Sequence, residues 1–136
     1  MKKAGYSKEP INFETELIVR DKVWFSKETD KPYSGKVFSL HENGRKYEEG
    51  TIRDGKMEGK WFQWYESGKK ETEFTCQSGV ISGITVVWSP DGKESTEIIW
   101  KNGEPWEGTE IGWNENGQMI SQVTFVQGNK MGKDTD

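Results

Sequence analysis

Short segments that alternate apolar and polar residues follow one another along most of this chain, separated by turn-forming pairs. The segment 60–65 (KWFQWY) is rich in aromatic residues, which are enriched in β-strands. Turns recur so often that no helix of ordinary length fits between them. The pattern therefore predicts an all-β protein made of antiparallel hairpins.

Glycines show that these hairpins repeat. One column of glycines recurs at intervals of 24, 24 and 25 residues, and two further columns keep the same steps. The columns are Gly44, Gly68, Gly92 and Gly117; Gly35, Gly59, Gly83 and Gly108; and Gly55, Gly79, Gly103 and Gly128. Each hairpin cannot bury its apolar face alone, so the repeats are predicted to stack into a single elongated, twisted open sheet.

Each repeat contains two turn signals. The first is expected to be a type I′ turn, because Asn-Gly and Asp-Gly tolerate positive φ at both central residues. It occurs at Asn43-Gly44, Ser67-Gly68, Asp91-Gly92 and Asn116-Gly117. The second ends the following strand at Asp54-Gly55, Ser78-Gly79, Asn102-Gly103 and Gln127-Gly128.

A period of two assigns faces within each strand. In the first strands, the apolar columns are Phe38/Leu40, Phe62/Trp64, Val86/Trp88 and Ile111/Trp113; in the second strands they are Gly50/Phe74/Ile98/Val123 and Ile52/Cys76/Trp100/Phe125. We expect all of these columns to form one apolar stripe, the core. The opposite face then carries mainly Glu and Thr, together with Trp61, Gln63 and Tyr65.

The repeat domain is predicted to span residues 11–132. A degenerate cap (11–32), containing a hairpin with its turn at Asp21-Lys22, precedes repeats at about 33–44, 45–68, 69–92 and 93–117 and a partial repeat at 118–132. Residues 1–10 are read as disordered or derived from cloning, because Lys2-Lys3-Ala4-Gly5 resembles a cloning scar, and 133–136 as a tail. The strand from Ile120 to Val126 is expected to be an uncovered edge, open to pairing with another copy.

The register of glycines and aromatic residues, seen in Asp54-Gly55-Lys56-Met57-Glu58-Gly59-Lys60-Trp61, resembles the MORN-repeat variant of bacteria, often labelled YwqK-type antitoxins. The similarity covers about residues 33–132. It implies an open sheet shaped like a slit pipe, contacts with proteins or membranes, and no catalytic residues. The third unit departs from the pattern, since Val80-Ile81-Ser82 replaces the polar spacer.

Composition and charge narrow the classes of partner. Seven Trp and a net charge of only −4 argue against a disordered chain. No Lys/Arg cluster supplies the basic surface that nucleic acid requires, and the acidity disfavours an anionic membrane. Neither a membrane-length apolar run nor a signal peptide is evident. The sequence does not determine the compartment: as given it indicates a cytoplasmic protein, and a periplasmic or envelope-associated one if a native signal peptide was removed.

The sequence has few candidate catalytic or metal-binding residues. His41 is the sole histidine and is read as a surface turn residue, since a lone His does not make a metal site. Cys76 falls in an apolar column without a base nearby, so a buried thiol is expected. Glu49, Glu73 and Glu97 form an acidic ladder about 10 Å apart, and we expect cross-strand Lys or Arg to neutralise them. We expect no catalytic residue, cofactor or metal.

Aromatic residues outside the predicted stripe are the candidates for partner binding, because exposed aromatics are frequent interface anchors. They are Trp61, Tyr65, Tyr33 and Trp106. The sequence favours a non-enzymatic protein-binding or scaffold module. The alternatives are an antitoxin that neutralises a toxin by complex formation, a structural protein of the envelope, or a polysaccharide hydrolase with a close carboxylate pair.

Overall fold

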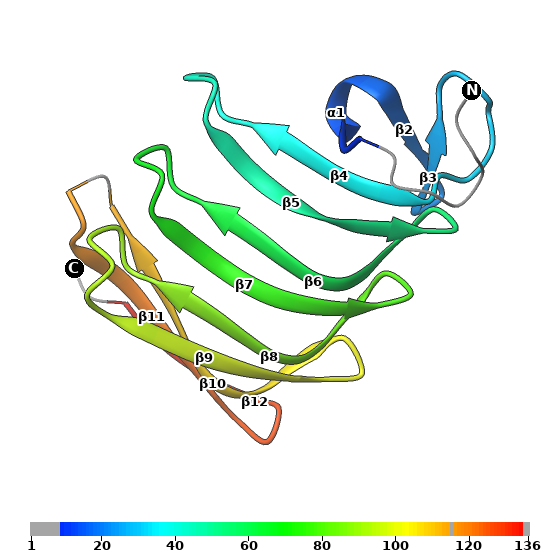
Figure 1. The fold of residues 1–136 in the computed structure, drawn as a ribbon. Coiled ribbons are helices and arrows are strands. Elements are labelled where there is room, and N and C mark those ends of the chain that lie inside the picture. The colour runs from blue at the N-terminus through cyan, green and yellow to red at the C-terminus, as the bar shows by residue number, and fades with distance from the viewer. Residues whose placement is uncertain (1–8, 115, 135–136) are drawn as a thin grey trace.

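The computed structural model describes residues 9–114 and 116–134, and within these the protein is nearly all β (Figure 1). An open ten-stranded sheet is accompanied by a small two-stranded hairpin and one short helix, which confirms the predicted fold class. The ten strands lie in the order β1 (Ile11–Asn12), β4 (Gly35–Leu40), β5 (Lys46–Arg53), β6 (Lys56–Trp64), β7 (Lys70–Gln77), β8 (Val80–Trp88), β9 (Ser95–Lys101), β10 (Glu104–Trp113), β11 (Met119–Val126) and β12 (Asn129–Asp134). The helix is α1 (Phe13–Glu16), and the small hairpin consists of β2 (Leu17–Arg20) and β3 (Val23–Ser26).

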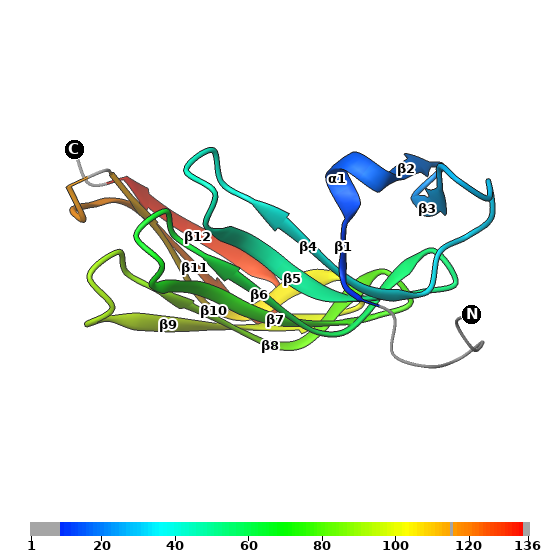
Figure 2. The ribbon, with the colours of Figure 1, turned by 45° about the horizontal axis from the view of Figure 1, so that its top comes forward.

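Neighbouring strands of the large sheet are antiparallel from β4 onward, and only β1 runs parallel to its neighbour β4. The sheet is curved, and α1 lies on its concave side (Figure 2). Because of this curvature, β10, β11 and β12 lie behind the preceding strands in Figure 1. We call the side that carries α1 the inner face, and the opposite, convex side the outer face.

The two turns of each repeat differ from expectation. Both residues have positive φ at the turns after β5, β7, β9 and β11, for example Asp54 (50°) and Gly55 (83°). These are the turns of I′ character. At the first turns only the glycine has positive φ, because a wider loop is closed by bonds such as His41 N–H to Arg45 O (2.8 Å) and Gly44 N–H to His41 O (2.9 Å). The prediction of type I′ geometry at the first turns is therefore wrong.

The buried core lies on the inner face near the N-terminal end of the sheet. Phe13 packs edge-to-face on Trp24 and on Trp61, with ring centroids 5.2 and 6.1 Å apart. The buried members of this core are Phe13, Leu17, Val37, Ile52, Trp61, Phe74 and Cys76. The predicted cap is confirmed as a hairpin with its turn at Asp21-Lys22, and α1 contributes Phe13 to the core.

The pairing of neighbouring strands shows that the predicted faces of the first strand of each repeat are wrong: the side chains expected in the core lie on the opposite face. Trp61 is directly opposite Phe74, whereas Phe62 is directly opposite Glu73. Residues opposite each other share a face, so Trp61 lies in the core and Phe62 lies outside it with the glutamates. A period of two separates the faces of one strand, but only the pairing register says which face meets which in the next strand.

The C-terminal edge also differs from the prediction. The strand from Ile120 to Val126 forms most of β11 and pairs with β12, from Val126↔Asn129 to Ser121↔Asp134. It is therefore not an uncovered edge, because the partial repeat closes into one more strand. The cloning-derived reading of residues 1–8 falls outside the described residues. Among the described residues, no helix has the length and apolar character needed to cross a membrane.

Candidate functional site

The four aromatic residues predicted to bind a partner have different environments. Trp61 is 1% exposed, so the expectation that it lies on an open surface is wrong. Tyr65 is half-buried and its hydroxyl donates to the carbonyl oxygen of Trp88 at 2.5 Å. Burial, followed by the charge of Glu71, raises the pKa of Tyr65 to about 12. Tyr33 is half-buried and packs against the edge of the core.

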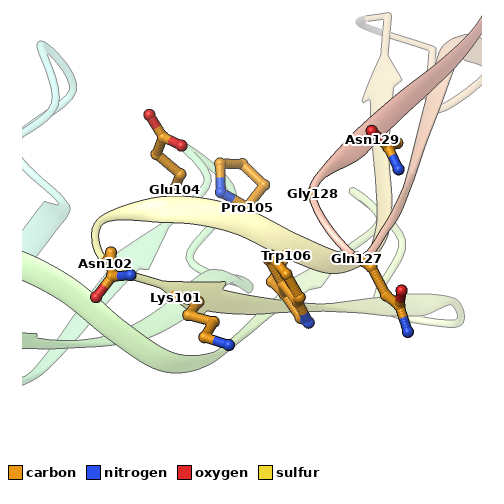
Figure 3. A pocket seen from close by; sticks show the side chains of 8 residues that line it. All are labelled: Lys101, Asn102, Glu104, Pro105, Trp106, Gln127, Gly128 and Asn129. Atoms are coloured by element: carbon orange, nitrogen blue, oxygen red, sulfur yellow. The ribbon is translucent and has the colours of Figure 1, made fainter.

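Trp106, the fourth residue, occupies the same repeat position as Tyr33. Gly55 N–H donates to Tyr33 O, and Gly128 N–H donates to Trp106 O, each at 2.8 Å. The indole lies at an open pocket of about 450 Å³, where the Lys101 ammonium is 4.4 Å from the ring centroid (Figure 3). Lys101, Trp106 and Gln127 point to one side of this pocket and Glu104 to the other, so its polar groups do not converge.

A row of alternating apolar and acidic side chains crosses the outer face. Register places the members directly opposite one another on six successive strands. This outer ladder consists of Phe38, Glu49, Phe62, Glu73, Val86 and Glu97. Lys46 pairs with Glu49 at 2.9 Å, and Lys70 pairs with Glu73 at 3.6 Å. Among the described residues, a cross-strand lysine pairs only with Glu73, from Lys60 at 3.7 Å, so the expectation of cross-strand neutralisation is confirmed for Glu73, whereas the lysine that pairs with Glu49 lies on the same strand.

A second line of aromatic side chains borders the outer ladder. The rings of Phe62 and Trp64 are 6.1 Å apart, and both are half-buried. The Lys70 ammonium lies 4.8 Å from the ring centroid of Phe62 and 5.6 Å from that of Trp88. Nearby, Ile84 and Ile99 are opposite each other and remain 51% and 40% exposed. The outer face thus combines an apolar surface with fixed charges.

The inner face carries a different set of polar residues beyond the core. We call His41, Tyr47, Glu48, Tyr65 and Glu71 the acidic patch. Its members are half-buried residues of β5, β7 and the two loops that follow β4 and β6. The rings of His41 and Tyr47 are 4.8 Å apart. His41 Nε2 lies 2.6 Å from Trp64 O, which requires the proton on Nε2, so this residue bridges two repeats.

The members of the acidic patch are close enough to change one another's pKa values. Burial raises the pKa of Glu48, with Glu14 of α1 adding to the increase and the hydrogen bond from Gln63 Nε2 (2.9 Å) opposing it. Burial also raises the pKa of Glu71, which His41 counteracts. The pKa of Tyr47 is raised by burial and then by Glu48, Glu71 and Glu14. The patch is therefore a partly desolvated region of negative charge.

Cys76 has none of the features of a reactive thiol. It is fully buried, and burial together with Glu58 and Glu48 raises its pKa to about 11. At neutral pH the thiol is protonated, and a thiol rather than a thiolate is a poor nucleophile. Among the residues that the structure describes, no three His, Cys, Asp or Glu side chains are grouped so that they could hold a metal ion.

No family model, curated protein or solved structure matches this chain. The two surfaces must therefore be interpreted from their own geometry. Neither surface follows from the sequence pattern, because alternation places the aromatic columns of the first strands in the core and does not single out Glu48 or Glu71. Both surfaces depend on register and on the bulges before Leu40 and Trp64, where the alternation of faces is interrupted.

Proposed function

We propose that this chain is a non-enzymatic protein-binding module of MORN-like repeats, and that its outer face contacts the partner. The observation that supports this proposal is the line of half-buried aromatic side chains on a sheet face that no other described element covers. Phe62, Trp64 and Trp88 supply large apolar surfaces together with fixed ring orientations. Aromatic residues held in this way are enriched among the residues that dominate binding energy.

Charged residues around these rings support specific recognition of a partner rather than non-specific hydrophobic association. The ammonium groups of Lys46 and Lys70 lie 6.0 and 4.8 Å from the ring centroids of Trp64 and Phe62, and each also pairs with a glutamate. Both charges therefore lie at the border of the apolar surface. An apolar centre with a charged rim is the usual anatomy of a protein interface, in which the rim charges set orientation and association rate.

The test is affinity capture from a lysate of the source organism, comparing the unaltered chain with a Trp64→Ala/Trp88→Ala variant. The matched control is Thr51→Ala/Thr75→Ala, which changes two outer-face residues without removing an aromatic ring. We expect a partner that the unaltered chain and the control retain and the Trp variant loses. Circular dichroism must show that all three proteins are folded. A partner retained equally by the Trp variant would refute the outer face as the binding surface.

A further inference from the structure

We propose that the acidic patch on the inner face binds the guanidinium group of an arginine in a basic segment of a partner protein. This inference concerns the opposite face from the outer ladder and does not depend on the function proposed above. It rests on three observations among the described residues: carboxylates that form no ion pair with a lysine or arginine, a buried hydroxyl without a hydrogen-bond partner on the neighbouring strand, and aromatic rings close to the carboxylates.

The carboxylates of the acidic patch differ from those of the outer ladder. Glu49 and Glu73 each form ion pairs with lysines, whereas none of the ion pairs within 9–114 and 116–134 includes Glu48 or Glu71. Glu14 of α1 lies close enough to add to the negative potential. Charged carboxylates that are partly removed from water are costly without a counter-charge, so an incoming cation gains more here than at a solvated surface.

A buried polar group lies beside Glu48. Ser39 is 1% exposed, and its hydroxyl has no hydrogen-bond partner in the described part of the chain. It is directly opposite Glu48, which is in turn opposite Gln63 on β6. A buried hydroxyl that is left without a partner is costly, so a donor that reaches this row would satisfy it. Neighbouring strands thus align a hydroxyl, a carboxylate and an amide on one face.

The rings at the margin favour arginine over other cations. The rings of His41 and Tyr47 lie 4.8 Å apart, and Glu71 is close enough to both Tyr47 and Tyr65 to raise the pKa of each. A guanidinium is planar and weakly hydrated, so it stacks on aromatic rings while it donates two parallel hydrogen bonds to a carboxylate. An ammonium is more strongly hydrated and lacks the fork geometry. The patch therefore matches arginine better than lysine.

The experiment measures binding of a fluorescein-labelled dodecapeptide of alternating arginine and serine by fluorescence anisotropy at pH 7.5. The test variant is Glu48→Gln/Glu71→Gln, in which the amide introduced by the first substitution keeps an oxygen that can accept from Gln63. The control variant is Glu66→Gln/Glu97→Gln, which makes the same change in net charge at an exposed turn and on the outer face. We expect at least a tenfold weaker affinity for the test variant and less than a twofold change for the control.

Three results would overturn the proposal. They are equal weakening in both variants, absence of binding to the unaltered chain, and equally tight binding of a lysine-serine peptide. Loss of fold does not explain the expected result, since replacing partly buried carboxylates by neutral amides removes a desolvation cost, and thermal melting of each variant checks this. The Trp64→Ala/Trp88→Ala variant should bind the peptide as the unaltered chain does, so the two proposals fail separately.

Discussion

The indole of Trp61 packs closely over Gly50 in the core, and the substitution Gly50→Ala tests this packing. Gly50 stands where the next repeats have Phe74 and Ile98 on the inner face. Its φ is not in the positive range, so an L-residue fits the backbone. A Cβ added there would nevertheless meet the indole of Trp61 at Cδ2, Cε2 and Cε3, and even Cε3, the most distant of the three, would be only 2.6 Å away.

The expected loss of stability in Gly50→Ala depends on how far the Trp61 indole can move. Ordinary contact begins near 3.4 Å, so Cε3 alone must recede by about 0.8 Å (3.4 minus 2.6) and the other two atoms by more. Trp61 is 1% exposed and packs against both Phe13 and Phe74. Overpacking of this kind costs about 1–3 kcal/mol. Without the clash, the same substitution would stabilise a strand by about 0.5–1 kcal/mol, because glycine is entropically costly.

The two explanations therefore predict opposite signs for the free energy of unfolding. Urea denaturation followed by far-ultraviolet circular dichroism measures it, since this signal does not depend on the tryptophan that is changed. In a Trp61→Leu background the ring is absent, and Gly50→Ala should become neutral or stabilising. A double-mutant cycle with a coupling energy near zero, or a stabilised single variant, would refute the packing of Trp61 over Gly50.

The remaining predictions concern the two faces and the titrating groups. Trp61→Ala should cost about 3–5 kcal/mol in denaturant unfolding but Trp64→Ala only about 1 kcal/mol, and the reverse order would support the face assignment expected from alternation alone. Tyr65→Phe removes the bond to the neighbouring repeat and should cost about 1 kcal/mol by thermal melting; an unchanged stability would contradict that bond. Because the folded-state pKa of Glu48 is raised above 4.5, the folded chain binds more protons than the unfolded chain just above pH 4.5. The free energy of unfolding should therefore decrease as pH rises above 4.5, and the decrease should be smaller in the Glu48→Gln variant. A larger decrease in that variant would contradict the raised pKa of Glu48. Cys76 should react with a disulfide reagent at pH 8 only at the rate of unfolding, and rapid labelling of the native chain would contradict its burial.

Several features of the fold follow from the sequence alone. The glycine spacing predicts the repeat, because glycine recurs at turn positions where the chain adopts positive φ, as Gly44 and Gly55 do. The hairpin signal at Asp21-Lys22 and the buried state of Cys76 are local or compositional, and both are confirmed. These inferences depend on a residue and its near neighbours, which the sequence displays directly.

The assignment of faces and surfaces depends on the tertiary structure. Trp61 and Phe62 are adjacent aromatic residues, and either is plausible as core from the pattern alone. Pairing of Trp61 with Phe74, the missing side chain at Gly50 and the packing of Phe13 from α1 together place Trp61 inside. A shift of one residue in register exchanges the two faces of a strand, so local alternation cannot decide between them. The curl of the sheet and the position of α1 then determine which face carries the buried core.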